Sequence, residues 1–207
     1  MTIDSGWIMR DFFLVALVAY LLGSIPFGYL LYRCRAGQDI RMTGSGNIGA
    51  TNVFRAAGWV TAAATFALDA GKGYAAVVIA AQISHGSDWS LALASVFVLV
   101  GHCFPVFLNF RGGKGVATAL GAFLGVSPAA TFICAVFFAL DVAMFGYVSL
   151  ASILAAAVFP VLLLILGGYS VPILVAAFAS SFLIILRHRG NIHRLRAGLE
   201  PNVFRRR

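Results

Sequence analysis

Seven apolar stretches dominate this sequence and constrain its fold more than any other feature. They lie at residues 12–32, 59–82, 89–108, 112–126, 128–147, 149–167 and 171–187. A bilayer-spanning helix uses about 20 residues, so these stretches take up most of the 207 residues. Turns rich in Gly, Pro and Ser separate several of them, and no alternating β pattern is present. The sequence therefore predicts an all-α integral membrane protein with seven transmembrane helices, forming a single membrane-embedded domain over residues 1–207.

Composition excludes the main alternatives to a membrane protein. Only 11% of the residues are charged, 61% are apolar, and the mean hydropathy is +0.94. Soluble domains carry about 25% charged and about 45–50% apolar residues, so a water-soluble enzyme or a disordered chain is excluded. The three cysteines are an odd number without metal-ligand spacing, and we expect them to act as small apolar fillers. No metal site and no cofactor is predicted.

The basic residues predict the orientation of the chain in the membrane. Lys and Arg collect on the cytoplasmic side of membrane proteins. If the first helix runs from outside to inside, 13 of the 15 basic residues fall on one side, Arg10 falls on the other, and Lys72 lies within a span. We therefore expect the N-terminus outside and the C-terminus in the cytoplasm. This split also accounts for the net charge of +8 without a nucleic-acid partner.

A polar, glycine-rich segment follows the first apolar stretch, at residues 43–52, with Arg55 just beyond. Successive glycines allow backbone N–H groups to converge on an anion, and Ser and Asn side chains add donors. A flexible linker is the alternative interpretation. Gly44, Gly46 and Gly49 also fit G-x-G-x-x-G, but no strand precedes them, as a dinucleotide-binding fold requires. The sequence therefore disfavours a dinucleotide-binding fold.

A second polar segment covers residues 101–118. Its Gly-Gly-Lys-Gly run is predicted to open a helix, so free N–H groups and the positive end of the helix dipole would face an anion. Lys114 and Thr118 are expected to share a helix face because they are four residues apart. Gly115 stands where a Walker A loop needs Ser or Thr. The segment thus predicts a phosphate-binding device of another kind, and a basic interfacial anchor is the alternative.

Further polar residues lie after the last apolar stretch and inside the second. A basic segment that only flanks a membrane span would need no more than arginines. Residues 188–200 also contain His188, Asn191 and the only glutamate, Glu200. Asp69 and Lys72 are three residues apart within a predicted span, so they share a face and can pair. A structural ion pair and a substrate contact both remain open for them.

Together these segments resemble the bacterial acyl-phosphate:glycerol-3-phosphate acyltransferase family, commonly called PlsY. The first segment matches its S-G-N-x-G-x-x-N pattern at Ser45, Gly46, Asn47, Gly49 and Asn52, with the family's arginine at Arg55. The second resembles its G-H-x-F-P…G-G-K-G-V-A-T pattern at His102, Phe104, Pro105 and residues 112–118. The third matches at His188, Asn191, Arg194, Leu195, Gly198 and Glu200. Residues 69–73 and 147–152 are also similar, although Gly146 stands where the family often has a basic residue.

The resemblance implies transfer of a fatty acyl group from acyl phosphate to the 1-hydroxyl of glycerol 3-phosphate, giving lysophosphatidate and phosphate. It also implies a bacterial inner-membrane location, an active site facing the cytoplasm, and no obligate protein partner. Lys114 and Arg55 would hold phosphoryl oxygens, while Ser45, His188 and Asn191 would orient substrate or stabilise the developing oxyanion. The other residues expected to contact substrate are Gly46, Asn47, Gly49, Asn52, His102, Asn109, Gly112, Gly113, Gly115, Thr118, Ser149, Ser152, Arg194 and Glu200.

A transporter or flippase for an anionic lipid or a phosphorylated solute is the competing hypothesis. Such a protein would place polar residues on both membrane faces or show inverted repeats. Here every polar motif falls on one predicted side, which favours an enzyme. No H-x-x-x-x-D pair occurs in the sequence, so the acyltransferase mechanism based on that pair is excluded.

Overall fold

The structure is a computed structural model that describes residues 5–204, and every regular element in that range is a helix. The predicted tail of arginines 205–207 lies outside the described residues. The α-helices are α1 (Ser5–Ser24), α2 (Phe27–Ala36), α3 (Ala50–Ile83), α4 (Asp88–Cys103), α5 (Val116–Val126), α6 (Pro128–Phe145), α7 (Val148–Leu166), α8 (Val171–Arg187) and α9 (Arg189–Arg196). Two 3-10 turns, η1 (Ile40–Met42) and η2 (Val106–Leu108), complete the order. The all-helical prediction is confirmed.

Helix lengths separate the clear membrane spans from the shorter pieces. Five helical segments are long and apolar enough to cross a bilayer, and α8 with α9, bent by 55°, makes a sixth. Helix α5 has 11 residues and is therefore about 16 Å long, roughly half the thickness of the hydrocarbon core. Helix α3 starts at Ala50 and has 34 residues, so it is longer than the predicted stretch. Its first turns end at Gly58, whose φ of 79° interrupts the helix.

Glycines bring two pairs of helices into close contact. A Cβ atom on Gly23 of α1 would lie 2.1 Å from the carbonyl oxygen of Val98 on α4. On the second pair, a Cβ atom on Gly121 of α5 would lie 1.8 Å from the carbonyl oxygen of Ala70 on α3. Small residues let helices approach in this way inside membranes, where dispersion contacts drive association. These glycines therefore fix α4 against α1 and α5 against α3.

The break between α1 and α2 is stabilised by the ion pair inside α3. Lys72 donates to the carbonyl oxygen of Ile25 at 2.8 Å and also lies 2.8 Å from Asp69 Oδ1. The side chains of Lys72 and Asp69 are 2% and 4% exposed, so the predicted pairing on one face of the helix is confirmed. Since Pro26 has no N–H to donate and the chain bends here, Lys72 satisfies a carbonyl that the broken helix leaves open.

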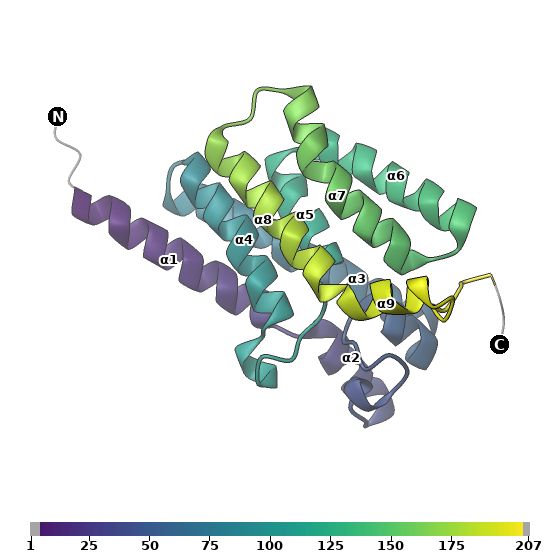
Figure 1. Ribbon diagram of the computed structural model, residues 1–207. Coiled ribbons are helices and arrows are strands. Elements are labelled where there is room, and N and C mark those ends of the chain that lie inside the picture. The colour runs from purple at the N-terminus through teal and green to yellow at the C-terminus, as the bar shows by residue number, and fades with distance from the viewer. Residues whose placement is uncertain (1–4, 205–207) are drawn as a thin grey trace.

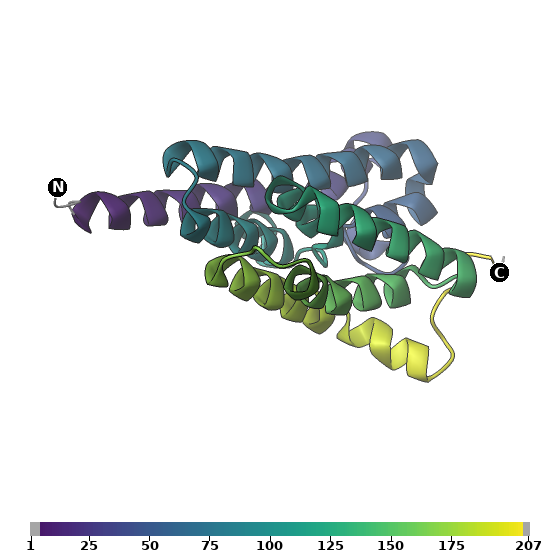
Figure 2. The ribbon, with the colours of Figure 1, turned by 90° about the horizontal axis from the view of Figure 1, so that it is seen from above.

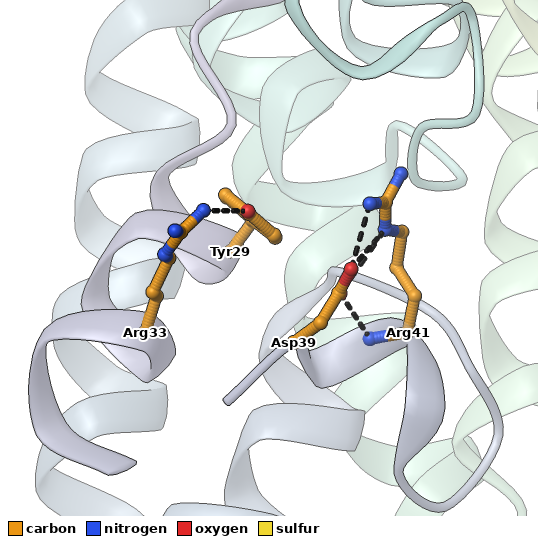
Figure 3. A network of polar contacts seen from close by, with 4 residues as sticks. All are labelled: Tyr29, Arg33, Asp39 and Arg41. Atoms are coloured by element: carbon orange, nitrogen blue, oxygen red, sulfur yellow. Dashed lines mark hydrogen bonds and ion pairs between the residues drawn. The ribbon is translucent and has the colours of Figure 1, made fainter. Parts of the chain in front are cut away.

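A polar network ties α2 to the turn that leads into the glycine-rich loop (Figure 3). Asp39 accepts hydrogen bonds from the backbone and guanidinium of Arg41, including one of 2.7 Å, while Arg33 donates to the Tyr29 hydroxyl at 2.5 Å. Both guanidinium groups also lie over the Tyr29 ring, at 5.8 Å for Arg33 and 5.4 Å for Arg41. The arginine hydrogen bond lowers the pKa of Asp39. This network orients η1, after which residues 43–49 begin.

The predicted polar segments gather at one end of the bundle. In Figure 1 the loop after α2, the start of α5, helix α9 and the α6–α7 turn all lie toward the end opposite the first turn of α1. Figure 2 shows α3 along one edge of the bundle and α8 with α9 along the other. The site that follows is therefore built between α3 and α9, from segments far apart in the sequence.

Candidate active site

The glycine-rich loop of residues 43–49 is folded around one buried side chain, Asn52. The Oδ1 atom of Asn52 accepts from the backbone N–H of Ser45 at 2.9 Å, and its Nδ2 donates to the carbonyl oxygens of Thr43 and Asn47, also at 2.9 Å. Gly44 has a φ of 59°, and a Cβ there would lie 2.4 Å from Asn52 Oδ1. Asn52 thus holds the loop in shape and leaves the exposed Ser45 at the cavity wall.

The second polar segment, residues 101–118, folds differently from the sequence prediction. The N–H groups of Gly112 and Gly113 donate to the carbonyl oxygens of Cys103 and His102, at 3.2 and 3.1 Å. They are therefore not free to bind an anion, and the prediction of an open N–H cradle at these two glycines is wrong. The reason is close packing, since a Cβ on Gly112 would lie 2.1 Å from the carbonyl oxygen of His102.

The start of α5 also differs from the prediction. The helix begins at Val116 after Gly115, which has a φ of 85°, so Lys114 precedes the helix. The predicted sharing of a helix face by Lys114 and Thr118 is therefore wrong. Thr118 is fully buried, and its carbonyl oxygen would lie 2.1 Å from a Cβ on Gly73 of α3.

One hydrogen-bond network joins the second loop, α7, α9 and the chain after α9. Lys114 donates to Asn191 Oδ1 at 2.6 Å, and Asn191 Nδ2 donates to Glu200 Oε1 at 2.7 Å. Glu200 also accepts from Ser149 Oγ at 2.6 Å and from Arg194 Nε at 2.8 Å. The Glu200 side chain is 6% exposed. A single carboxylate therefore aligns an amide, a hydroxyl and a guanidinium, and the amide in turn orients the Lys114 ammonium.

Burial and neighbouring groups in this network shift the pKa values of Lys114 and Glu200. Burial lowers the pKa of Lys114 to about 8, although the nearby Glu200 carboxylate acts to raise it. Burial also acts to raise the pKa of Glu200, but hydrogen bonds from Ser149, Asn191 and Arg194 outweigh it and lower the pKa. Glu200 is therefore an anion, and Lys114 is mostly a cation at neutral pH.

These elements enclose a polar cavity of about 650 Å³. That volume lies within the range of sites for small organic ligands. Three cationic side chains, Arg55, Lys114 and Arg194, line it together with Glu200, and Asp69 also lines it. The predicted site residues that line it are Ser45, Asn47, Gly49, Asn52, Arg55, His102, Lys114, Gly115, Ser149, Ser152, His188, Asn191, Arg194 and Glu200. The predicted residues that do not line it are Gly46, Asn109, Gly112, Gly113 and Thr118.

A second, apolar cavity of about 310 Å³ adjoins the first. It lies among α3, α5, α6, α7 and α8, and it shares the lining residues Phe66, Val116, Phe138 and Ser152 with the polar cavity. The site therefore combines a cationic polar chamber with an apolar one, as an amphiphilic substrate with an anionic head and a hydrocarbon tail requires.

Comparisons with known proteins agree with this architecture. A family model described as glycerol-3-phosphate acyltransferase matches residues 13–198. The chain belongs to the glycerol-3-phosphate acyltransferase family. It is 48% identical over 191 residues to the glycerol-3-phosphate acyltransferase of Jannaschia sp. (strain CCS1), covering 92% of each chain. It is 49% identical over 194 residues to that of Gluconobacter oxydans (strain 621H), again covering 92% of each.

Solved structures extend the family relationship to the fold. The crystal structure of PlsY (YgiH), an integral membrane glycerol 3-phosphate acyltransferase, in its glycerol 3-phosphate form, is similar with a TM-score of 0.88 and 42% identity, covering 92% of this chain and 94% of that one. Its lysophosphatidic acid form gives a TM-score of 0.84 at 40% identity over the same shares. This acyltransferase family member is therefore a multi-pass membrane protein. The family membership supports the acyltransferase hypothesis over the transporter alternative.

Sequence reasoning missed Arg187 as part of the site of this family member. Arg187, at the end of α8, donates to the carbonyl oxygens of Gly113 at 3.1 Å and Gly112 at 3.0 Å. Its guanidinium also lies 5.1 Å from the centre of the Phe104 ring. The side chain therefore fastens the loop that carries Lys114 to α8. Its position next to His188 was the available signal, but the sequence pattern marks it only as one more basic residue.

Proposed function

We propose that this protein transfers a fatty acyl group from acyl phosphate to the 1-hydroxyl of glycerol 3-phosphate. The products are 1-acyl-glycerol 3-phosphate and inorganic phosphate, and the step would be the first acylation of phospholipid synthesis. One observation carries the proposal: the cationic polar cavity and the apolar cavity share four lining residues. An acyl phosphate needs both environments at once, because its phosphate is anionic and its tail is a hydrocarbon.

The cations of the polar cavity are proposed to hold the two phosphates. Lys114 and Arg55 bind phosphoryl oxygens in this scheme, and Arg194, already paired with Glu200, lines the same cavity. Ser45, His188 and Asn191 orient the substrates or donate to the oxyanion that forms on the acyl carbonyl. The remaining predicted residues that line the cavity contact substrate, while Gly46, Gly112 and Gly113 shape the loops around it and Thr118 packs α5 against α3. Asn109, exposed with a φ of 53°, stays outside the proposed contacts.

The proposed chemistry balances with the two substrates alone. The glycerol 3-phosphate O1 attacks the acyl carbon, the bond from that carbon to the phosphate oxygen breaks, and phosphate leaves with the electron pair. A phosphate oxygen takes the proton of the hydroxyl. Because phosphate is a good leaving group, the site mainly has to position the reactants and stabilise charge, which fixed donors in a closed site do well.

We further propose that residues 1–207 form one membrane-embedded domain with seven transmembrane segments and no obligate protein partner. Helix α5 is the short seventh segment, entered through the loop that carries Lys114. The basic asymmetry of 13 residues to one supports an external N-terminus, a cytoplasmic C-terminus and an active site facing the cytoplasm of the bacterial inner membrane.

A phosphate-release assay on purified protein tests this function. We expect palmitoyl phosphate to yield phosphate and lysophosphatidate only when glycerol 3-phosphate is added. Palmitoyl thioesters of coenzyme A or acyl carrier protein should give no turnover, since the sequence lacks the H-x-x-x-x-D pair. Efficient turnover with either thioester, or no acyl transfer from palmitoyl phosphate, would refute the proposal.

A further inference from the structure

The chain after α9 crosses from one side of the polar cavity to the α6–α7 turn. We define residues 199–204 as the C-terminal strap. They follow directly after the segment that the family model matches, residues 13–198. Leu199, Glu200 and Pro201 line the polar cavity. The strap is therefore one wall of the site, and the way it is anchored affects the position of Glu200.

Asn202 and the next two residues clip the strap to the turn. Asn202 Nδ2 donates to the carbonyl oxygen of Phe145 at 2.9 Å, and the Val203 N–H donates to that of Gly146 at 2.9 Å. The Phe204 N–H donates to Asn202 Oδ1 at 2.9 Å. Asn202 thus uses both ends of its amide, one toward the turn and one toward its own strap.

Gly146 makes room for this clip. It ends α6 in the left-handed conformation with a φ of 75°, and its N–H donates to the carbonyl oxygen of Val142 at 2.8 Å. A Cβ atom at this position would lie 2.5 Å from both Asn202 Nδ2 and Asn202 Oδ1. The amide of Asn202 therefore occupies the space that a side chain at position 146 would enter.

Asn202 lies two positions after Glu200, the carboxylate that organises the site. Glu200 accepts from Ser149, at the start of α7 just after the same turn, and from Asn191, which accepts a hydrogen bond from Lys114. We propose that Asn202 is a positioning residue for acyl transfer: by clipping the strap to the α6–α7 turn it sets Glu200, which in turn sets Asn191 and Lys114. This inference rests on the proposed function of the same site.

Such a role has a consequence that simple loss of stability lacks. The charged groups near Lys114 are Glu200, Arg194, Arg55 and Arg187, of which only Glu200 acts to raise the pKa of the lysine. His188 also lies close enough for the charge of Lys114 to affect its pKa. If the strap loosens and Glu200 moves away, the pKa of Lys114 falls further below about 8. The activity would then be lost at a lower pH than in the wild-type enzyme.

The experiment compares Asn202→Ala with a matched control, Phe204→Ala, which removes a 64% exposed side chain from the same strap. Phosphate release from palmitoyl phosphate is measured at varied concentrations of glycerol 3-phosphate and as a function of pH. We expect Asn202→Ala to lower kcat/KM by about three- to tenfold, from the loss of hydrogen bonds of ordinary strength, and to shift the alkaline limb to lower pH. Phe204→Ala should behave as the wild-type protein.

A double-mutant cycle with Glu200→Gln asks whether Asn202 acts through Glu200. If it does, Asn202→Ala adds little to the loss already caused by Glu200→Gln. Full additivity of the two losses would overturn the inference, as would wild-type kinetics for Asn202→Ala. Should Asn202→Ala not purify as folded protein, Asn202→Asp replaces only the amide that donates to Phe145 and is expected to change activity in the same direction.

Hydrogen–deuterium exchange supplies a readout that does not depend on acyl transfer. In Asn202→Ala we expect faster exchange in the strap and also in α9, because Glu200 would hold Asn191 and Arg194 less well. Exchange that rises only in the strap, with α9 unchanged, would contradict the coupling. A wild-type protein that releases no phosphate would refute the proposed function, while the α9 exchange would still decide the positioning role.

Discussion

Replacement of Lys114 tests the centre of the proposed site. The Lys114 ammonium donates to Asn191 at 2.6 Å and lines the polar cavity. A hydrogen bond to a charged group contributes about 1.5–3 kcal/mol, and each 1.36 kcal/mol is a factor of about ten in rate. We therefore expect Lys114→Ala to lower kcat/KM for phosphate release by about 10- to 150-fold. Extraction and membrane insertion should stay normal, because the residue precedes α5.

Lys114→Arg should restore only part of this loss. The planar guanidinium is larger than the ammonium and is not interchangeable with it, and Gly113 and Gly115 leave little space beside it. A Cβ on Gly113 would already lie 2.1 Å from His102 Nε2. Arg111→Ala is the matched control, since Arg111 is an exposed cation on the same loop that does not line the cavity.

The pH dependence of kcat/KM gives a second, independent test of the role of the Lys114 charge. Its pKa is about 8, so the ammonium predominates below that pH and is lost above it. We expect kcat/KM to fall on the alkaline side with an apparent pKa near 8, and this limb to move upward in Lys114→Arg, which stays charged. If Lys114 were only an interfacial anchor, Lys114→Ala and Arg111→Ala would cost the same small amount. Equal kinetics for these two variants would therefore refute the phosphate role.

Three further predictions concern the rest of the molecule. Arg187→Ala should lower activity at least several-fold without changing protein yield, because its bonds to Gly112 and Gly113 hold the Lys114 loop; unchanged kinetics would contradict that role. Ala135→Phe, in the apolar cavity, should reduce kcat/KM for palmitoyl phosphate more than for octanoyl phosphate, and an unaltered ratio would exclude that cavity as the acyl site. Reporters fused before Met1 and after Arg207 should read external and cytoplasmic respectively, whereas the same side for both would require an even number of spans.

The amino-acid sequence by itself determined the membrane class, the helical fold and the end of the bundle where the site forms. These follow from local quantities: the transfer free energy of about 20 apolar residues, the glycine and proline breaks, and the distribution of Lys and Arg. The pairing of Asp69 with Lys72 was predictable for the same reason, because two residues three positions apart on one helix share a face.

Tertiary structure alone decided which polar groups are available and which are already used. Gly112 and Gly113 look like free donors in the sequence, yet their N–H groups bond to the end of α4. The bond from Lys114 to Asn191 joins residues 77 positions apart, and the bond from Asn202 to Phe145 joins residues 57 apart. Such partners depend on how helices pack through close contacts between small residues, and no local periodicity in the sequence encodes that packing.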